Sequence, residues 1–315
     1  MISYLEFEKP IAALEARIAE LRQTAQAGDV DIDSEIRRLE MKSADLLAST
    51  YKALTPWQKT QVARHPMRPH FCDYVGQVFT DFMPLGGDRY FGDDQAIIGG
   101  FAKLGNRRVM LIGHEKGNDT QSRLRHNFGM GKPEGYRKAI RLMEMAGRFG
   151  LPVVTLVDTS GAFPGVEAEE RGQAEAIARS TEACLALPVP MVAVIVGEGG
   201  SGGAVALASA ERVLMLEHAV YSVISPEGCA SILWRTNEKA ADAAEAMKVT
   251  AQDLLSLKVI DRVVKEPVGG AHRDPALAAQ ALAKAVGEEL DQLGKLSPDK
   301  LRAMREERFL RIGES

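Results

Sequence analysis

Apolar residues in the first part of the chain return at heptad spacing, in two short runs separated by charged residues. The runs are Ile11, Leu14, Ile18 and Leu21, followed by Ile32, Ile36, Leu39 and Leu46. The polar segment AQAGDVD, residues 25–31, joins them. Each run spans only about two heptads, which is short for a coiled coil. We therefore expect residues 1–65 to form a helical hairpin that packs on the main body or on a partner.

From about residue 95 the pattern changes to apolar runs that alternate with amphipathic segments. Strands are predicted at 108–115, 152–159, 190–196 and 212–217, and helices at 133–149 and 167–187. Runs such as VAVIV are apolar throughout, as in strands that are buried on both faces. This alternation predicts an α/β domain over residues 66–315.

The last hundred residues continue the alternation and end in helices. In VYSVISPEGCASILWR, a strand should run into a helix that has Ser225 as its N-cap and Pro226 at its first position. Residues 249–264 predict a further helix, and the turn GGAH follows it. Residues 275–311 predict an amphipathic helical tail with a charged, solvated face.

Composition narrows the class of protein. With 315 residues, of which 45% are hydrophobic, the chain can bury a full core in one large domain or two. A net charge of -4 argues against a dedicated nucleic-acid binder. No run approaches the roughly eighteen apolar residues of a membrane span, and the N-terminus carries acids where a signal peptide needs an apolar segment. We expect a soluble, cytoplasmic protein that does not enter a membrane.

Cysteine and histidine give no metal signature. Cys72, Cys184 and Cys229 lie far apart, and an odd number cannot form a fully paired disulfide framework, so we expect buried free thiols. The six histidines form no H-E-x-x-H arrangement and adjoin no cysteine pair. We therefore predict no metal in this chain.

The segment GEGGSGGA satisfies two side-chain motifs at once. Gly199, Ser201 and Gly203 form G-x-S-x-G, the turn that presents a nucleophilic serine, with Asp261 and His272 as conceivable partners. Two residues, Gly197 and Glu198, are predicted to lie between the strand and that turn, and no H-G-G-G element supplies an oxyanion donor. The nucleophile interpretation is therefore weak.

The second motif is the dinucleotide fingerprint G-x-G-x-x-G, formed by Gly197, Gly199 and Gly202, with Glu217 as the acid. It comes after two complete strand and helix units, and it leaves room for a helix of barely ten residues, both unusual for that fingerprint. The phosphate-binding P-loop is absent, because GMGKPEG has the lysine without the spacing.

A third interpretation needs no side chain. Glycines at a strand-to-helix turn expose N–H groups that can hold an oxyanion. A second loop, DTSGAFPGVEAEERG, also follows an apolar strand, contains glycines and opens a helix. We expect the two loops to face each other and to offer N–H donors to one site.

Four segments carry a family resemblance. In chain order they are NFGMGKPEGYRKAIRLM, VDTSGAFPGVEAEERGQAEAIA, GEGGSGGA and YSVISPEGCASILWR. Together they resemble the α subunits of the bacterial carboxyltransferase component of acetyl-CoA carboxylase, and the likeness covers essentially the whole chain. The resemblance implies a crotonase (ClpP-like) fold, built as a spiral of ββα units.

The resemblance also implies an activity: transfer of a carboxyl group from carboxybiotin, on biotin carboxyl carrier protein, to acetyl-CoA, which gives malonyl-CoA for fatty acid synthesis. In that family a zinc-ribbon β subunit binds the CoA thioester, the subunits form α2β2, and ATP is used by the separate biotin carboxylase.

Carried onto this sequence, the family's α-subunit oxyanion donors match the N–H groups of Gly202 and Gly203, with Gly199 and Gly200 shaping the turn. They would face the biotin ureido oxygen. Gly161 and Ala162, in the second loop, are further candidates from the two-loop argument alone.

Two alternatives stay open on the sequence. One is an acyl-CoA hydratase or hydrolase of the crotonase type, complete in one chain. The other is a subunit that only scaffolds a partner's active site. A hydratase needs acid and base groups near the thioester, and GEGGSGG supplies no convincing one.

Overall fold

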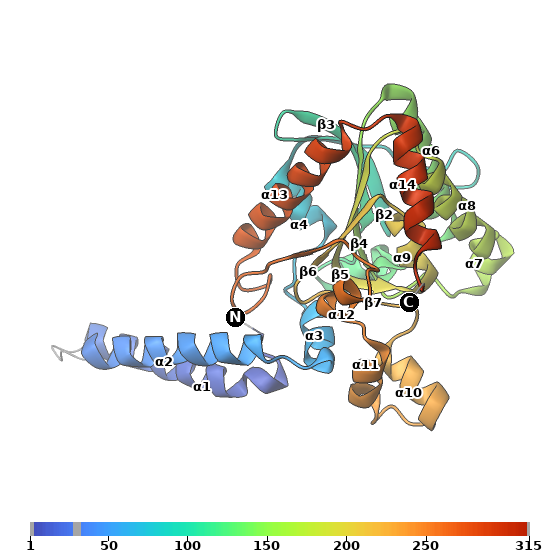
Figure 1. Ribbon diagram of the computed structural model, residues 1–315. Coiled ribbons are helices and arrows are strands. Elements are labelled where there is room, and N and C mark those ends of the chain that lie inside the picture. Colours follow the sequence, from blue (N-terminus) through green and yellow to red (C-terminus); the bar gives the residue numbers. More distant parts are fainter. Residues whose placement is uncertain (1–2, 28–32, 314–315) are drawn as a thin grey trace.

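The computed structural model describes residues 3–27 and 33–313, and its centre is an 8-stranded sheet (Figure 1). The strands are β1 (Phe79–Pro84), β2 (Ile97–Leu104), β3 (Arg107–His114), β4 (Val153–Thr159), β5 (Met191–Gly200), β6 (Arg212–Leu216), β7 (Val220–Ser222) and β8 (Arg262–Val264). Their order is β1-β2-β3-β4-β5-β6-β8, and β7 pairs with β5 beyond the end of β6. The strands β1 to β3 pair antiparallel, whereas the pairs from β3 onward are parallel.

Helices cover both faces of the sheet (Figure 1). In chain order they are α1 (Lys9–Ala27), α2 (Asp33–Lys52), α3 (Pro56–Ala63), α4 (Phe71–Val78), α5 (Thr120–Arg125), α6 (Pro133–Phe149), α7 (Val166–Glu170), α8 (Gln173–Ala186), α9 (Ser201–Ala208), α10 (Pro226–Trp234), α11 (Ala240–Met247), α12 (Ala251–Ser256), α13 (Pro275–Leu293) and α14 (Pro298–Leu310), with short 3-10 turns at Glu6–Glu8 and Asn127–Gly129. Helices α6, α8 and α9 pack together on one side, while α4 and α13 pack together on the other. Every residue of β4 and β5 is buried, as the apolar run VAVIV predicted for β5.

The N-terminal hairpin forms as expected and projects away from the sheet (Figure 1). Its heptad residues Ile11, Ile18 and Ile36 are buried. Ile32 and most of the expected connecting segment lie within 28–32, outside the described residues. The base of the hairpin is tied to the body, because Arg273 contacts Glu15 at 2.9 Å and Glu8 at 3.4 Å.

Several predicted elements are confirmed closely. The helix at 133–149 is α6, and the strands at 108–115, 152–159 and 212–217 are β3, β4 and β6. Ser225 caps α10 by accepting the N–H of Gly228 at 3.0 Å, with Pro226 at the first helical position. Capping chemistry therefore fixes the start of α10 from sequence alone.

Three helix predictions were wrong in extent. The helix expected over 167–187 is broken into α7 and α8, because Gly172 adopts a φ of +79° between them. Within 249–264 only α12 is helical, and the last three residues of that range form β8, which pairs with β6. The C-terminal tail is divided into two helices, α13 and α14, and its amphipathic character is confirmed because Leu282, Leu290 and Leu301 are buried in the core.

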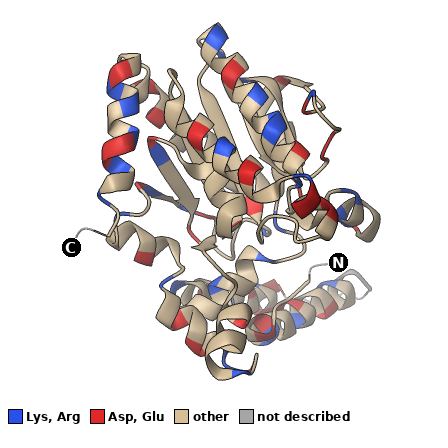
Figure 2. Cartoon of the chain, turned by 90° about the vertical axis from the view of Figure 1, so that its right-hand side faces the viewer, with Lys and Arg blue, Asp and Glu red and all other residues tan. Residues whose placement is uncertain are grey.

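Charged residues of both signs cover the outer helices (Figure 2), and the thiols differ in exposure. Lys and Arg alternate with Asp and Glu along the outer helices, so both signs are interspersed there (Figure 2). The three thiols are free, but only Cys184 is buried; Cys72 is exposed and Cys229 intermediate, which corrects the expectation of buried thiols. Among the described residues, none of the helices combines the length and apolar character that a membrane crossing requires.

Candidate functional site

The chain passes from strand β5 directly into helix α9 at the glycine-rich turn. Gly199 and Gly200 are the last residues of β5, because β7 extends the ladder by pairing with Glu198–Gly200. Ser201 begins α9 with a φ of +52°, in the left-handed region that side chains disfavour. The expectation that the strand ends before Gly197 is therefore wrong, since it overlooked β7.

Close backbone packing explains the glycines of this turn. A Cβ at Gly200 would lie 2.2 Å from the carbonyl oxygen of Ser160. A Cβ at Gly203 would lie 2.8 Å from the carbonyl carbon of Gly161, a distance that real Cβ atoms essentially never show. The two glycine-bearing loops therefore touch through their backbones instead of facing each other across a gap.

The N–H groups of this region differ in what they bind. Among the hydrogen bonds formed by the described residues, none uses the N–H of Gly202 or Gly203, which lie in the first turn of α9. Gly161 donates its N–H to Thr159 Oγ1 at 3.1 Å, and Ala162 packs against the core. Gly202 and Gly203 thus have unengaged donors at the positive end of a helix, whereas Gly161 does not.

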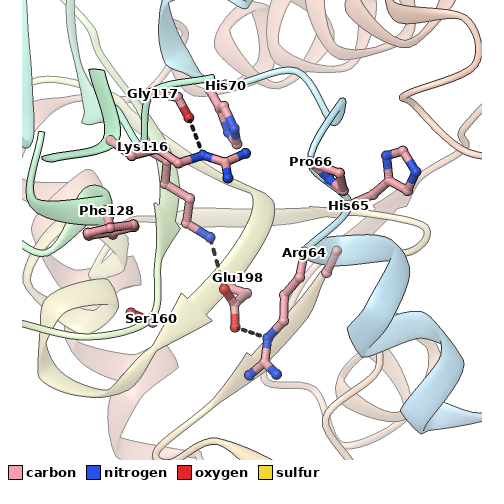
Figure 3. Close-up of a pocket in the computed structure, with 11 residues that line it drawn as sticks. Arg64, His65, Pro66, His70, Lys116, Gly117, Phe128, Ser160 and Glu198 are labelled. Atoms are coloured by element: carbon pink, nitrogen blue, oxygen red, sulfur yellow. Dashed lines mark hydrogen bonds and ion pairs between the residues drawn. The ribbon is translucent and has the colours of Figure 1, made fainter. Parts of the chain in front are cut away.

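A cavity of about 270 Å³ adjoins the turn, and Figure 3 shows the side chains that line it. A smaller hollow beside it reaches Gly199 and Gly200. Arg64, Ser160 and Glu198 line both, so the cavity continues toward the glycine turn.

A buried charge cluster forms one wall of this cavity. The Lys116 Nζ atom lies 2.7 Å from Asp158 Oδ1 and 2.9 Å from Glu198 Oε2. Arg64 Nε donates to the other oxygen of Glu198 at 2.6 Å, and His70 Nδ1 lies 3.0 Å from Asp158 Oδ2. Figure 3 shows Lys116 and Arg64 approaching Glu198 from opposite sides.

The cluster keeps its carboxylates ionised. Burial opposes ionisation of both Asp158 and Glu198. At Asp158 this effect is outweighed by Lys116 and His70, and at Glu198 it is outweighed by Lys116 and Arg64. The pKa of each acid therefore falls below its usual value. Burial also opposes the charge of Lys116, and the two carboxylates raise its pKa above the usual value. Glu198 is therefore a charged structural group and not a general acid poised near neutral pH.

Sequence reasoning missed this cluster, although its acids stand inside the quoted motifs. Asp158 belongs to VDTSG and Glu198 to GEGG. Buried acids at the ends of two neighbouring strands call for a cation, and this was the available signal.

The nucleophile interpretation of Ser201 finds no partners. Asp261 pairs with Arg308, and His272 stacks on His65 with ring centroids 3.8 Å apart. Among the described residues neither forms a hydrogen bond with Ser201.

The same stacked pair belongs to a group that could hold a metal ion. Ligand atoms of Glu8, His65 and His272 all lie within 4.8 Å of one another. However, His65 Nε2 already lies 2.9 Å from the carbonyl oxygen of Ser3, and Glu8 already accepts from Tyr51. The group is explained as a buried polar junction between the N-terminus and the GGAH turn.

Comparison with known proteins gives the family. Residues 4–313 match the family described as acetyl co-enzyme A carboxylase carboxyltransferase-like. The chain belongs to this family. The acetyl-coenzyme A carboxylase carboxyl transferase subunit alpha of Erythrobacter litoralis is 79% identical over 99% of this chain and 100% of its own length. The corresponding subunit of Rhizorhabdus wittichii is 74% identical over the same shares.

Solved structures agree on the fold of this carboxyltransferase family member. The transcarboxylase 12S structure matches with a TM-score of 0.59 and 17% identity, covering 74% of this chain and 44% of that one. A Pseudomonas malonate decarboxylase hetero-tetramer matches with a TM-score of 0.57 and 16% identity, covering 68% of this chain and 86% of that one. The expected α/β crotonase-type fold is therefore confirmed.

Membership in the carboxyltransferase family also ranks the interpretations of the glycine turn. It does not favour the single-chain hydratase or hydrolase, nor a subunit that is only a scaffold. The assignment of Gly202 and Gly203 as oxyanion donors stays a prediction, with their unengaged N–H groups as its structural support.

Proposed function

We propose that this chain is the α subunit of an acetyl-CoA carboxylase carboxyltransferase and supplies one half of a shared active site. The reaction would move a carboxyl group from carboxybiotin to acetyl-CoA and give malonyl-CoA. The observation that carries the site assignment is the pair of unengaged N–H groups, Gly202 and Gly203, at the start of α9.

The residues of the turn fit the biotin ureido group. When bound, biotin supplies a ring nitrogen that carries the carboxyl group. The N–H groups of Gly202 and Gly203 would be fixed donors to the ureido oxygen, where carboxyl transfer would place negative charge. The contact between Gly203 and Gly161 leaves the turn little room to shift, so the donors need not reorganise during the reaction.

The partners follow from the same proposal. A β subunit would bind the CoA thioester and provide a second oxyanion hole, and the two chains would assemble as α2β2. Biotin would arrive on its carrier protein, after biotin carboxylase has loaded it. Residues 1–65 would form a helical extension of the carboxyltransferase domain, 66–315.

The test is decarboxylation of malonyl-CoA in the presence of free biotin, measured with this chain alone, with the β subunit of the same organism alone, and with both mixed. Activity in the mixture only would support a shared site. Activity of this chain alone would overturn it, because the chain would then hold a complete site.

A further inference from the structure

Strands β3, β4 and β5 end side by side, and one ammonium group joins their ends. Lys116 lies two residues beyond β3, Asp158 lies in β4, and Glu198 lies in β5. The Lys116 side chain is only 14% exposed, yet its Nζ atom contacts both acids. Burying a charge costs free energy unless the charge is paired. The buried ammonium group of Lys116 therefore depends on both carboxylates, which hold it in place.

The stem of Lys116 is also fixed by packing. Gly129 adopts a φ of +79°, and a Cβ there would lie 2.8 Å from Lys116 Cγ and 2.8 Å from the carbonyl oxygen of Asp158. The backbone of the NFGM segment therefore lies directly against the lysine. Its ammonium group is held between the two acids by contacts on both its aliphatic and its charged end.

The acids that Lys116 neutralises set the path of the backbone into the glycine turn. The parallel ladder between β4 and β5 shifts register after Val157, so regular pairing is interrupted. At this point Asp158 Oδ1 accepts the N–H of Glu198 at 2.9 Å and replaces the missing ladder acceptor. A Cβ at Gly197 would lie 2.4 Å from the same oxygen, so the carboxylate lies tightly against the strand.

Glu198 extends the same arrangement to the other side of the turn. Arg64 bridges Glu198 to Glu227 of α10, with its second contact at 2.5 Å. The carboxylate of Glu198 is thereby held between Lys116 and Arg64, one residue before Gly199. A displacement of Glu198 would be passed directly to the residues that follow it.

We propose that Lys116 is a positioning residue, which fixes the direction of the Gly202 and Gly203 N–H groups by clamping Asp158 and Glu198 together. This inference rests on the proposed function for its effect on rate, while its effect on the turn itself does not depend on that function.

Apart from His70, the basic groups near Asp158 in the described part of the chain do not substitute for Lys116. Arg68 is fully engaged by Glu266, with Nη2 2.7 Å from Oε1. His114 is buried beside Asp158, and burial lowers the pKa of His114 to about 4, so it is neutral at pH 7. Without Lys116, the ion-pair partners left among the described residues would be His70 for Asp158 and Arg64 for Glu198.

The experiment compares Lys116→Met, Lys116→Arg and the control Lys103→Met in the α/β mixture. Lys103 is a matched control because it is a salt-bridged lysine on strand β2, paired with Asp81 away from the cavity. Size-exclusion chromatography first confirms that each variant binds β. We expect Lys116→Met to lower kcat by about 100-fold, with KM for biotin and malonyl-CoA unchanged, and Lys116→Arg to restore most of the rate.

A pH profile separates positioning from simple damage. In Lys116→Met a buried carboxylate loses its cation, so its pKa rises, and the rate should increase as the pH falls through this new ionisation. Wild type and Lys116→Arg should lack it. Adding Glu198→Gln to Lys116→Met returns the net charge of the cluster to its wild-type value and should recover about tenfold in rate. A raised KM for either substrate would show that Lys116 contacts substrate, and no recovery in the double variant would show that the unbalanced charge does not cause the loss of rate. Either result would overturn the inference.

Hydrogen exchange of the peptide covering 197–204 supplies a readout without catalysis. We expect faster amide exchange there in Lys116→Met than in wild type or Lys103→Met. Equal exchange would overturn the positioning role even if the rate fell. An inactive wild-type mixture would contradict the proposed function alone, and the exchange comparison would still decide the role of Lys116. If Lys116→Met does not fold, the comparison is made with the double variant, which also lacks the clamp between Asp158 and Glu198. Exchange of 197–204 equal to that of wild type in this variant counts against the clamp.

Discussion

Replacing Gly203 with alanine adds one methyl group at a backbone contact between the two glycine-bearing loops. The new Cβ would lie 2.8 Å from the carbonyl carbon of Gly161 and 2.9 Å from the nitrogen of Ala162. Both neighbours are backbone atoms, so no side-chain rotation can relieve the contact. The first turn of α9 must move away from the loop that contains Gly161.

The size of that movement follows from the contact. Ordinary van der Waals contact begins at 3.4 Å, so the gap must open by the difference between 3.4 and 2.8 Å, about 0.6 Å. Catalytic groups need to be held within about 0.5 Å of their productive geometry. We therefore expect the variant to lose the donor's contribution, roughly 10²- to 10³-fold in kcat or about 2.7–4 kcal/mol, with an overpacking cost to folding of about 1–3 kcal/mol. A larger β-branched residue such as valine should abolish transfer.

Gly202→Ala is the matched control for this experiment. Its Cβ would meet only the Ile177 side chain, at 3.3 Å, and that side chain can rotate. Alanine also favours a helix over glycine by about 1 kcal/mol, so the variant should stay folded and lose less than about tenfold in rate. The assay is malonyl-CoA decarboxylation with β bound, alongside urea unfolding. Normal turnover of Gly203→Ala would refute the oxyanion assignment.

Ser201→Ala should retain kcat to within about tenfold, because the turn acts through its backbone. Removal of a catalytic nucleophile would instead lower kcat on the order of 10⁴-fold or more. Measuring kcat and testing for a burst phase decide between the two. Arg68→Met should destabilise the fold by about 3–5 kcal/mol in urea unfolding, since it leaves Glu266 alone where both side chains are 0% exposed; an unchanged midpoint would contradict this. Burial opposes ionisation of Glu266, but Arg68 lowers its pKa to about 2 from the usual 4.5. The folded pKa is the lower one, so this stabilisation is complete above pH 4.5 and is lost as the pH falls toward 2; acid unfolding of Arg68→Met should begin at higher pH than that of wild type.

The sequence predicted elements best where the physical signal is local. The continuous apolar runs VAVIV and VLML predicted β5 and β6, and the serine-proline pair predicted the start of α10. Strand β7 was missed as the extension of β5, because only three residue pairs, Glu198–Gly200 with Val220–Ser222, form its ladder. That pairing depends on where the chain returns in space, which periodicity does not report.

In the candidate site, too, local features could be predicted from the sequence and long-range contacts could not. The glycines could be found from the sequence, because the need for close backbone approach restricts a position to one residue type. The charge cluster could not be assembled, because Lys116 and Glu198 are 82 positions apart and each has ordinary neighbours in sequence. Only the strand order brings the two together.

The tie between the hairpin and the body also bears on how the chain folds as it is made. Arg273 contacts Glu15 at 2.9 Å and Glu8 at 3.4 Å, so the first helix is bonded to a residue more than 250 positions later. At a synthesis rate of about 5–20 residues per second, Glu8 waits roughly ten to fifty seconds for that arginine. Helices α1 and α2 can pair with each other early, but their docking must be among the last events. A ribosome-bound chain that stops before residue 273 should therefore carry a formed but undocked hairpin.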